Sequence, residues 1–321
     1  MLSAVIPVFN EVGSLAALYA ELDQVARAHS YDLQIIFVDD GSTDGSWQAI
    51  CELARHDQRV LGLKFRRNFG KAAALSAGFN AAQGELVMTL DADLQDDPHE
   101  VPRFLAAMEQ NLDVISGWKQ VRHDPWHKVL PSRIFNWMVS ALTGVALHDH
   151  NCGMKCYRRE IFREVRLYGE LHRFVPVLAA ARGFRVGELV IQHRPRKFGR
   201  SKYGLRRFIK GFLDLLTVKF LTGFGQRPQH LLGAIGLSFF VIGLVWLGYL
   251  ALYWLVTQLH PDWQWMPLHQ RPAMLYAVGA LLLGGQLMSI GFLAELITAY
   301  QGRDSDTYSI ADRTGDPDKT A

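Results

Sequence analysis

The chain has 321 residues, with 34 Lys and Arg against 31 Asp and Glu, 49% hydrophobic residues and a mean hydropathy of +0.04. Only three charged residues fall between positions 228 and 302, so the rest of the chain has the charge content of an ordinary globular domain. This composition excludes a disordered or collagen-like chain, and the presence of only three cysteines (Cys51, Cys152 and Cys156) excludes a disulfide scaffold. The sequence therefore predicts a globular head followed by a membrane tail.

Along residues 1–117, short apolar runs alternate with segments that have the apolar period of a helix. The expected strands are 4–9, 33–38, 60–65, 86–90 and 114–116, and the expected helices are a first one with Leu15, Leu18, Tyr19, Leu22 and Val25 on one face, then 44–55, 70–82 and 98–110. Such alternation is typical of an α/β fold with a parallel, doubly wound sheet. Ligands bind beyond the carboxyl ends of the strands in these sheets. The positions that follow the strands are Asn10 and Glu11, Asp39 and Asp40, 66–71, 91–97 and 117–119.

Most of these strand ends carry charged or strongly polar residues. Asp39 and Asp40 end the second strand. Asp91 and Asp93 alternate after the fourth, where the two-residue period of a strand would point both side chains to the same side. Oxygen ligands arranged in this way suit Mg²⁺ or Mn²⁺, which keep open positions for substrate phosphates. Asp97, which precedes a proline, is explained as the cap of a helix.

Several common motifs do not occur in the chain. Without a GxxxxGK[ST] loop or a GxGxxG fingerprint, P-loop hydrolysis and dinucleotide redox chemistry have no support. No zincin spacing and no GxSxG elbow is present, so a zinc hydrolase or an esterase is disfavoured. Cys152 and Cys156 are expected to be packed thiols.

The tail contains two long uncharged stretches. Residues 231–256 are almost wholly apolar, and as a helix they would be roughly 39 Å long, enough to span a bilayer with some tilt. A second uncharged stretch runs from Ala273 to Ala294, and Trp263 and Trp265 between the two suggest a short external loop at the membrane interface. The alternative, a pair of buried core helices, is disfavoured because core helices rarely exceed about 18 residues without a charge.

A basic segment precedes the tail. Residues 194–227 contain ten Lys and Arg against one acid, Asp214, so the positive-inside rule places the head and both termini in the cytoplasm. Residues 205–221 have the pattern of an amphipathic helix lying in the membrane interface, and 129–145 is either a second such helix or one buried against the head. Because the basic run leads directly into a span, anionic lipid head groups or a phosphate-bearing substrate explain it better than nucleic acid, and no nucleic-acid partner is expected.

Six segments in chain order carry a resemblance to a known family. They are VIPVFNE (5–11), VDDGSTDGS (38–46), RNFGKAAALSAGF (67–79), LDADLQDDP (90–98), YGELHRFVPVLA (168–179) and RPRKFGRSKYG (194–204). Together they resemble glycosyltransferase family 2, and within it the polyprenyl-phosphate glycosyltransferases, the group of dolichol-phosphate mannose synthase and bactoprenol glucosyltransferase. The resemblance extends from residue 3 to about 300, since bacterial members also end in two spans.

The resemblance implies a GT-A head that transfers a sugar, with inversion, from a nucleotide diphosphate sugar to a polyprenyl phosphate. The resemblance leaves the donor open among UDP-glucose, GDP-mannose and UDP-N-acetylhexosamines, with the first two favoured. The implied acceptor is undecaprenyl phosphate or a similar lipid, and the implied location is a bacterial inner membrane. The implied nucleoside contacts are Pro7, Phe9, Glu11, Val38, Asp40 and Ala92, and the implied ligands of Mg²⁺ or Mn²⁺ are Asp91, Asp93 and Gln95. Arg196 and Lys202 match basic residues that bind phosphate, and Lys119 stands where relatives usually have Arg, which would turn a bidentate phosphate contact into a single one.

The chain departs from the family in one block. Many relatives have TGDFRL where this chain has DHNCGMKCYRRE at 149–160, with Gly153 at the place of the Asp and Asp149 as its candidate replacement. A phosphate acceptor is largely dianionic at pH 7, so a general base is dispensable.

Lys71 either contacts a phosphate or is solvated, and His172 with Arg173 either positions substrate or anchors a helix.

The predicted organisation is a GT-A head at 1–193, a basic substrate loop with a juxtamembrane helix at 194–227, two spans at 228–298 and a cytoplasmic tail at 299–321. Gly-rich spans would also permit close packing in a homo-oligomer. One alternative is a processive polysaccharide synthase of the same family, but such enzymes carry a QxxRW motif and more spans. The other is a non-catalytic membrane adaptor, which the presence of Asp91, Asp93 and Lys202 disfavours.

Overall fold

The computed structural model describes residues 1–120, 126–165, 171–192, 194, 211, 213–215, 217–219, 228–260, 267 and 271–301. These residues fall into two compact units, which we call the head, within Met1–Thr222, and the helix pair, within Gly223–Tyr308.

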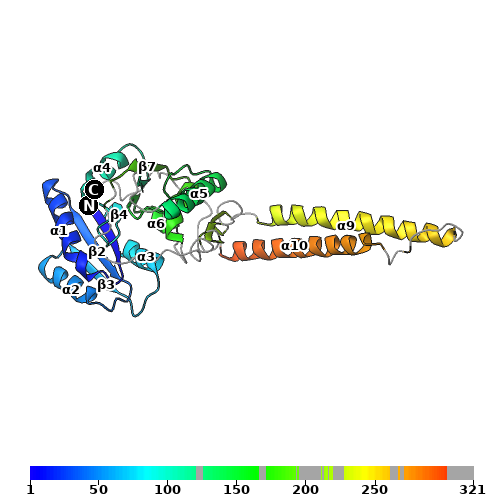
Figure 1. Cartoon of the computed structure of the whole chain (residues 1–321), viewed down its shortest axis with the longest axis horizontal. Helices are drawn as coiled ribbons and strands as arrows, with labels where there is room; N and C mark the ends of the chain where they lie inside the picture. Colours follow the sequence, from blue (N-terminus) through cyan, green and yellow to red (C-terminus); the bar gives the residue numbers. More distant parts are fainter. Residues whose placement is uncertain are drawn as a thin grey trace, which may run out of the picture. The chain divides into compact units, whose positions relative to one another are not determined.

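A seven-stranded sheet forms the centre of the head (Figure 1). Its strands are β1 (Leu2–Val8), β2 (Leu33–Asp39), β3 (Val60–Lys64), β4 (Leu86–Thr89), β5 (Val114–Trp118), β6 (Lys155–Arg158) and β7 (Val186–Val190), in the spatial order β3-β2-β1-β4-β6-β5-β7. β6 is antiparallel to β4 and β5, and the other neighbouring strands are parallel. The carboxyl ends of β1 to β5 therefore meet at one edge.

The five strands expected from the sequence all form and run parallel to one another as expected, but the sheet also contains two strands that the sequence did not predict. β6 lies between β4 and β5, and β7 extends the sheet beyond β5. β6 has the sequence KCYR, in which two of four residues are basic, so it lacks the apolar run that identifies a buried strand. Its lysine is nevertheless buried, because the strand has neighbours on both sides.

Helices cover both faces of the sheet. α1 (Val12–Ala28), α2 (Ser46–His56) and α4 (Val101–Met108), which follows the short helix η1 (Pro98–Glu100), pack on one face, and α3 (Lys71–Ala81), α6 (Ile161–Glu164) and α7 (Val175–Ala181) pack on the other. Successive residues of β2 alternate between the two cores: Ile35 and Phe37 face the first, Ile36 and Val38 the second. Burying each such side chain contributes about 1.5–3 kcal/mol.

A third apolar cluster includes residues of the basic segment. Phe135 and Val139 of α5 (Trp126–Thr143) pack against η2 (Leu171–Phe174) and against Leu215 and Val218. The other face of α5 is solvent-exposed and apolar, with Trp137 72% exposed. α5 thus has one apolar face buried against the head and a second apolar face exposed in this unit. In the expected juxtamembrane helix, residues 211, 213–215 and 217–219 are helical, and its other positions lie outside the described residues.

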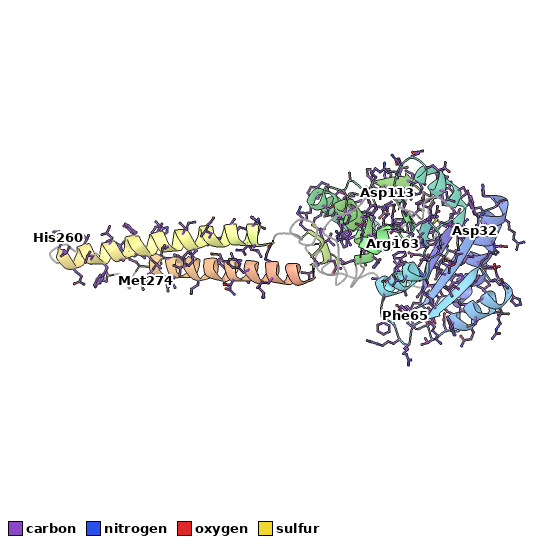
Figure 2. All side chains as sticks on the ribbon, turned by 180° about the vertical axis from the view of Figure 1, so that it is seen from behind. Asp32, Phe65, Asp113, Arg163, His260 and Met274 are labelled. Carbon is purple, nitrogen blue, oxygen red and sulfur yellow. The ribbon has the colours of Figure 1, made fainter. Side chains whose placement is uncertain are left out.

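The helix pair consists of α9 (Pro228–Leu259) and α10 (Ala273–Gln301), both long and apolar enough to cross a membrane (Figures 1 and 2). Only 11% and 17% of their most apolar windows are buried in the structure, which is far too little for core helices. Glycines allow α9 and α10 to approach each other closely, since a Cβ atom at Gly284 would lie 2.6 Å from the carbonyl oxygen of Gly236. Figure 2 labels His260, just after α9, and Met274 in the first turn of α10.

Candidate active site

The carboxylate of Asp91 forms an ion pair with a lysine at the sheet edge. β4 ends at Thr89, and the side chain of Asp91 pairs with the ammonium group of Lys71, the first residue of α3. Desolvation alone would raise the pKa of Asp91, but the positive charges of Lys71, Lys119 and Lys155 outweigh it and hold the pKa at about 2. Asp91 is therefore ionised at neutral pH, and Lys71 is paired rather than freely solvated.

Asp93 is placed by a turn and not by the period of a strand. Because β4 has already ended, the expectation that Asp91 and Asp93 alternate along a strand is wrong. The Oδ1 atom of Asp93 accepts a hydrogen bond from the backbone N–H of Gln95 at 3.2 Å. Leu94, between them, has a φ of +60°, a left-handed conformation that costs a non-glycine residue about 1–2 kcal/mol. We call residues 91–97 the DxD loop.

Lys119, at the end of β5, is held by an aspartate that the sequence did not single out. Its Nζ atom lies 2.8 Å from Oδ1 of Asp96, which is fully buried. Burial opposes the charge on Lys119, but Asp96 and Asp91 raise its pKa above the usual value, so the ammonium stays charged. Asp96 belongs to the segment LQDDP, but the sequence pattern there predicts the start of a helix and not an ion pair.

Asp40, for which the resemblance implies a nucleoside contact, holds a neighbouring loop in the structure. Its two carboxylate oxygens accept hydrogen bonds from the backbone N–H groups of Phe69 (2.6 Å) and Gly70 (2.9 Å). The next residue, Gly41, has a φ of +75°, and a Cβ atom there would lie 2.6 Å from the carbonyl carbon of Arg67. These hydrogen bonds hold the backbone at Phe69 and Gly70, directly before α3, whose first residue Lys71 pairs with Asp91.

The altered block at 149–160 folds around a buried lysine. Lys155 of β6 is 3% exposed, and its Nζ atom donates to the carbonyl oxygens of His150 (3.2 Å) and Cys152. Burial lowers the pKa of Lys155, and burial likewise raises the pKa of the Cys152 thiol to about 12, so this cysteine is the inert packed thiol that was expected. Sequence reasoning missed Lys155, whose residue type is rarely buried.

Gly153 lies directly against the first acid of the DxD loop. A Cβ atom on Gly153 would be 2.5 Å from Oδ2 of Asp91, so residue 153 has no room for a side chain in this arrangement. Asp149, the candidate replacement, is 2% exposed, and its Oδ1 atom accepts the backbone N–H of Asn151 at 3.1 Å. Asp149 thus stabilises a buried turn.

The other residues that the resemblance singled out are only partly brought together. Pro7 and Phe9 are partly exposed at the end of β1, whereas Val38 and Ala92 are buried. The backbone N–H of Glu11 donates to Oγ of Ser46 at 3.0 Å. Arg173 belongs to η2 beside His172, whose pKa lies well below its usual value because it is desolvated and close to Lys71. Arg196, Lys202, Trp263 and Trp265 lie outside the described residues.

The donor set of the DxD loop fits a hard divalent cation. Asp91 is ionised, and Asp93 and Gln95 add two more side chains with oxygen donors within four residues. In the described part of the chain, one group of three carboxylate or imidazole side chains has ligand atoms within 4.8 Å of one another, namely Glu21, Asp97 and His99. Arg194 already pairs with both of these carboxylates.

Comparison with known proteins places this arrangement in a family. The family model described as "Glycosyl transferase family 2" matches residues 3–166. The chain belongs to glycosyltransferase family 2. A dodecaprenyl-phosphate galacturonate synthase of Rhizobium johnstonii is 35% identical over 96% of this chain and 91% of its own length. An undecaprenyl-phosphate 4-deoxy-4-formamido-L-arabinose transferase of Aeromonas hydrophila is 36% identical over 92% of this chain and 88% of its own length.

Solved glycosyltransferase structures share the fold of the head. Glucosyl-3-phosphoglycerate synthase of Mycobacterium tuberculosis, solved with Mn²⁺, UDP-glucose and phosphoglyceric acid, superposes with a TM-score of 0.53 at 14% identity, over 69% of this chain and 79% of that one. Mannosyl-3-phosphoglycerate synthase of Rubrobacter xylanophilus gives a TM-score of 0.54 at 16% identity, over 68% and 74% of the two chains. The expected GT-A-like fold, followed by two apolar helices, is confirmed.

Proposed function

We propose that this glycosyltransferase moves a sugar from a nucleotide diphosphate sugar to a polyprenyl phosphate, with inversion, using a divalent cation. The observation that carries the proposal is the set of alternating charges at the carboxyl ends of β4 and β5, where Asp91 pairs with Lys71 and Asp96 with Lys119. Carboxylates for a cation and lysines for phosphates are what a pyrophosphate-bearing donor requires. The relatives named above, which match over both the head and the helix pair, supply the acceptor class.

The proposed reaction exchanges one bond at the anomeric carbon. The bond from this carbon to the β-phosphate oxygen breaks, and an oxygen of the acceptor phosphate bonds to the opposite face of the same carbon, so the nucleoside diphosphate leaves with the electron pair. In this proposal Lys71 and Lys119, which pair with acids at the strand ends, would stabilise the charge that grows on the leaving group. A Mg²⁺ or Mn²⁺ ion held by Asp91, Asp93 and Gln95 would supply further positive charge there.

No general base is needed in this reaction. The acceptor is a phosphate monoester with a second pKa near 6, so it is largely dianionic at neutral pH and already nucleophilic. This agrees with the burial of Asp149 and with a glycine at position 153, neither of which offers a carboxylate to a substrate. The chemistry therefore relies on positioning and on charge stabilisation.

We also propose that the enzyme is a multi-pass protein of a bacterial inner membrane, with the head and both termini in the cytoplasm. The two apolar helices provide the spans, and the excess of basic residues at 194–227 favours a cytoplasmic head. The exposed apolar face of α5, with Ile134 and Trp137, would lie in the membrane interface, where an indole ring is stable. The acceptor lipid and the site would then share one surface.

The test is transfer of radiolabelled sugar into an organic-extractable lipid by membrane vesicles that contain the full chain. The donor panel holds UDP-glucose, GDP-mannose and UDP-N-acetylhexosamines, among which the family resemblance leaves the donor open. It also holds nucleotide-linked galacturonate and 4-deoxy-4-formamido-L-arabinose, the sugars in the relatives' names. We expect label in lipid with one of these donors, lost on addition of EDTA and restored by Mg²⁺ or Mn²⁺. Inverted vesicles should be active and right-side-out vesicles inactive. Absence of lipid label with every donor would contradict the proposal.

A further inference from the structure

The chain that follows β7 is hydrogen-bonded to η1 and to the DxD loop. The backbone N–H of Gln192 donates to Oε1 of Glu100 at 3.2 Å, and the backbone N–H of Arg194 donates to the carbonyl oxygen of Gln95 at 3.1 Å. These contacts join positions almost one hundred residues apart. One of the proposed cation ligands, Gln95, is therefore held through its own backbone by Arg194.

The side chain of Arg194 adds a second attachment to the same loop. Its Nη1 atom donates to both carboxylate oxygens of Glu21, at 2.8 and 3.0 Å, and its Nη2 atom lies 2.7 Å from Oδ1 of Asp97. Glu21 belongs to α1, and Asp97 closes the DxD loop, where its side chain also accepts the backbone N–H of His99 at 2.9 Å. The planar guanidinium, with its fork of donors, bridges the loop to a rigid helix, which a lysine could not do in the same way.

The DxD loop needs such support because its backbone is strained. Leu94 has a φ of +60° and is 6% exposed, and a conformation of this cost persists only where the surroundings impose it. Lys119 pairs with Asp96 of the loop, and Arg194 holds Gln95 and Asp97. Asp93 and Gln95 lie on either side of Leu94, so any relaxation of this backbone displaces both.

We infer that Arg194 is a positioning residue for the divalent-cation site, holding the DxD loop in the conformation in which Asp93 and Gln95 present their oxygens together. This inference rests on the metal-dependent transfer proposed above. The alternative is that Arg194 makes only a partly exposed ion pair, and such pairs contribute about 0–1 kcal/mol to stability and nothing to a site. The two possibilities differ in what they predict for cation binding.

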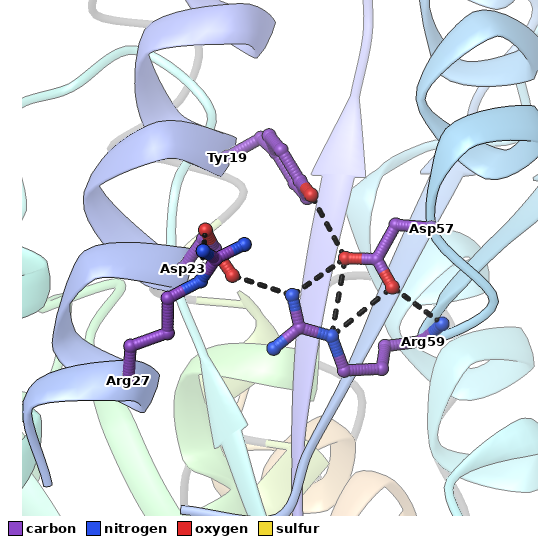
Figure 3. Close-up of polar contacts among 5 residues, drawn as sticks. All are labelled: Tyr19, Asp23, Arg27, Asp57 and Arg59. Carbon is purple, nitrogen blue, oxygen red and sulfur yellow. Dashed lines mark hydrogen bonds and ion pairs between the residues drawn. The ribbon is translucent and has the colours of Figure 1, made fainter. Parts of the chain in front are cut away.

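The chain offers a matched control in Arg59 (Figure 3). Its Nη2 atom pairs with Asp23 of α1 at 2.5 Å and with Asp57 at 2.7 Å, and Asp57 also accepts the hydroxyl of Tyr19 at 2.8 Å. Arg59 thus bridges α1 to a neighbouring segment, as Arg194 does. Its partner on α1, Asp23, lies two residues after Glu21, the partner of Arg194. None of the contacts drawn for this network involves the DxD loop.

The experiment compares Arg194→Met, Arg194→Lys and Arg59→Met in the full-length protein in detergent. Each protein is titrated with Mn²⁺ while free Mn²⁺ is measured by electron paramagnetic resonance. UDP or GDP is present, whichever gives the wild type the tighter Mn²⁺ binding. The transfer assay gives kcat and the donor KM. We expect Arg194→Met to weaken Mn²⁺ binding about tenfold and to raise KM more than it lowers kcat. Arg194→Lys should fall between Arg194→Met and the wild type, and Arg59→Met should bind Mn²⁺ as the wild type does.

Thermal unfolding of all three variants separates a positioning role from a general loss of stability. Wild-type Mn²⁺ affinity in Arg194→Met would overturn the inference, as would an equal loss of affinity in Arg59→Met. In both cases the wild type still binds Mn²⁺ and transfers sugar, so the proposed function stands. A wild type that binds no Mn²⁺ with either nucleotide overturns both.

Discussion

Lys155 shows how a single residue can link the fold to the site. It lies on the one antiparallel strand of the sheet, is almost fully buried, and donates hydrogen bonds to two carbonyl oxygens of the 149–153 turn. That turn brings Gly153 against the Asp91 carboxylate, and the charge of Lys155 is one of those that lower the pKa of Asp91. Removing it should therefore loosen the turn and leave two buried acceptors unpaired.

We predict that Lys155→Met lowers the free energy of unfolding by about 1–3 kcal/mol, the usual cost of leaving buried polar groups without partners. Met has a similar length, so little cavity is created. The matched control is Lys64→Met at the exposed end of the edge strand β3, where a surface substitution should change stability by about 0.5 kcal/mol or less. Denaturant unfolding of the purified variants measures both, and equal stability of the Lys155 and Lys64 variants would count against this account.

At the same scale, the sequence identified individual residues better than it identified their partners. Asp91, Lys71 and Lys119 stood out because each follows a predicted strand or begins a predicted helix. The pairing of Lys119 with Asp96 could not be predicted, since it depends on the position of β5 in the sheet and on a turn with a positive φ at Leu94. The contacts of Arg194 connect residues separated by 97 and 173 positions, which no local pattern encodes.

At the scale of elements, some of the glycines in the two apolar helices α9 and α10 lie where the helices meet, and others do not. Gly236, Gly243 and Gly284 lie at the contact, where a Cβ atom would come within 3 Å of the facing backbone. Gly285, the neighbour of Gly284, has no atom within 4 Å of the place a Cβ would occupy. Consecutive residues on a helix point about 100° apart, so this pair separates packing from intrinsic helix propensity.

We predict that Gly284→Ala destabilises the helix pair by about 1–3 kcal/mol through overpacking, while Gly285→Ala is neutral. Thermal unfolding of the full chain in mild detergent, followed by helical circular dichroism, compares the two. The substitutions are chemically identical and adjacent, so any general effect of alanine on the helix cancels. A Gly284 variant as stable as the Gly285 variant would show that the close approach does not hold the pair together.

Element prediction succeeded where periodicity was strong and failed where the sheet departed from it. The alternation of strands and helices along the first 117 residues was enough to predict the five strands whose ends form the site. β6 and β7 were missed because a four-residue strand with two basic residues and a strand exposed at the sheet edge both lack an apolar run. In the proposed function the antiparallel β6 matters, since it places Lys155 near Asp91.

At the scale of the whole molecule, the small net charge of +3 conceals two regions of opposite sign. Residues 194–227 carry a net charge of +9, so the remainder is acidic on balance, and part of that acidity lies in the DxD loop. In the proposed function, acids at the strand ends hold the cation, and basic residues lie beside the span that anchors the enzyme to the membrane of its lipid acceptor.

The central claim is that carboxylates of the DxD loop support sugar transfer to a polyprenyl phosphate through a divalent cation. The most direct test is the rate of transfer of labelled sugar into polyprenyl phosphate by the full chain carrying Asp93→Asn, measured beside the wild type with saturating Mn²⁺. We predict that the rate falls by a factor of about 100 or more, because a cation ligand is lost, while circular dichroism and membrane insertion are unchanged. An Asp93→Asn protein that transfers sugar at the wild-type rate would contradict the account.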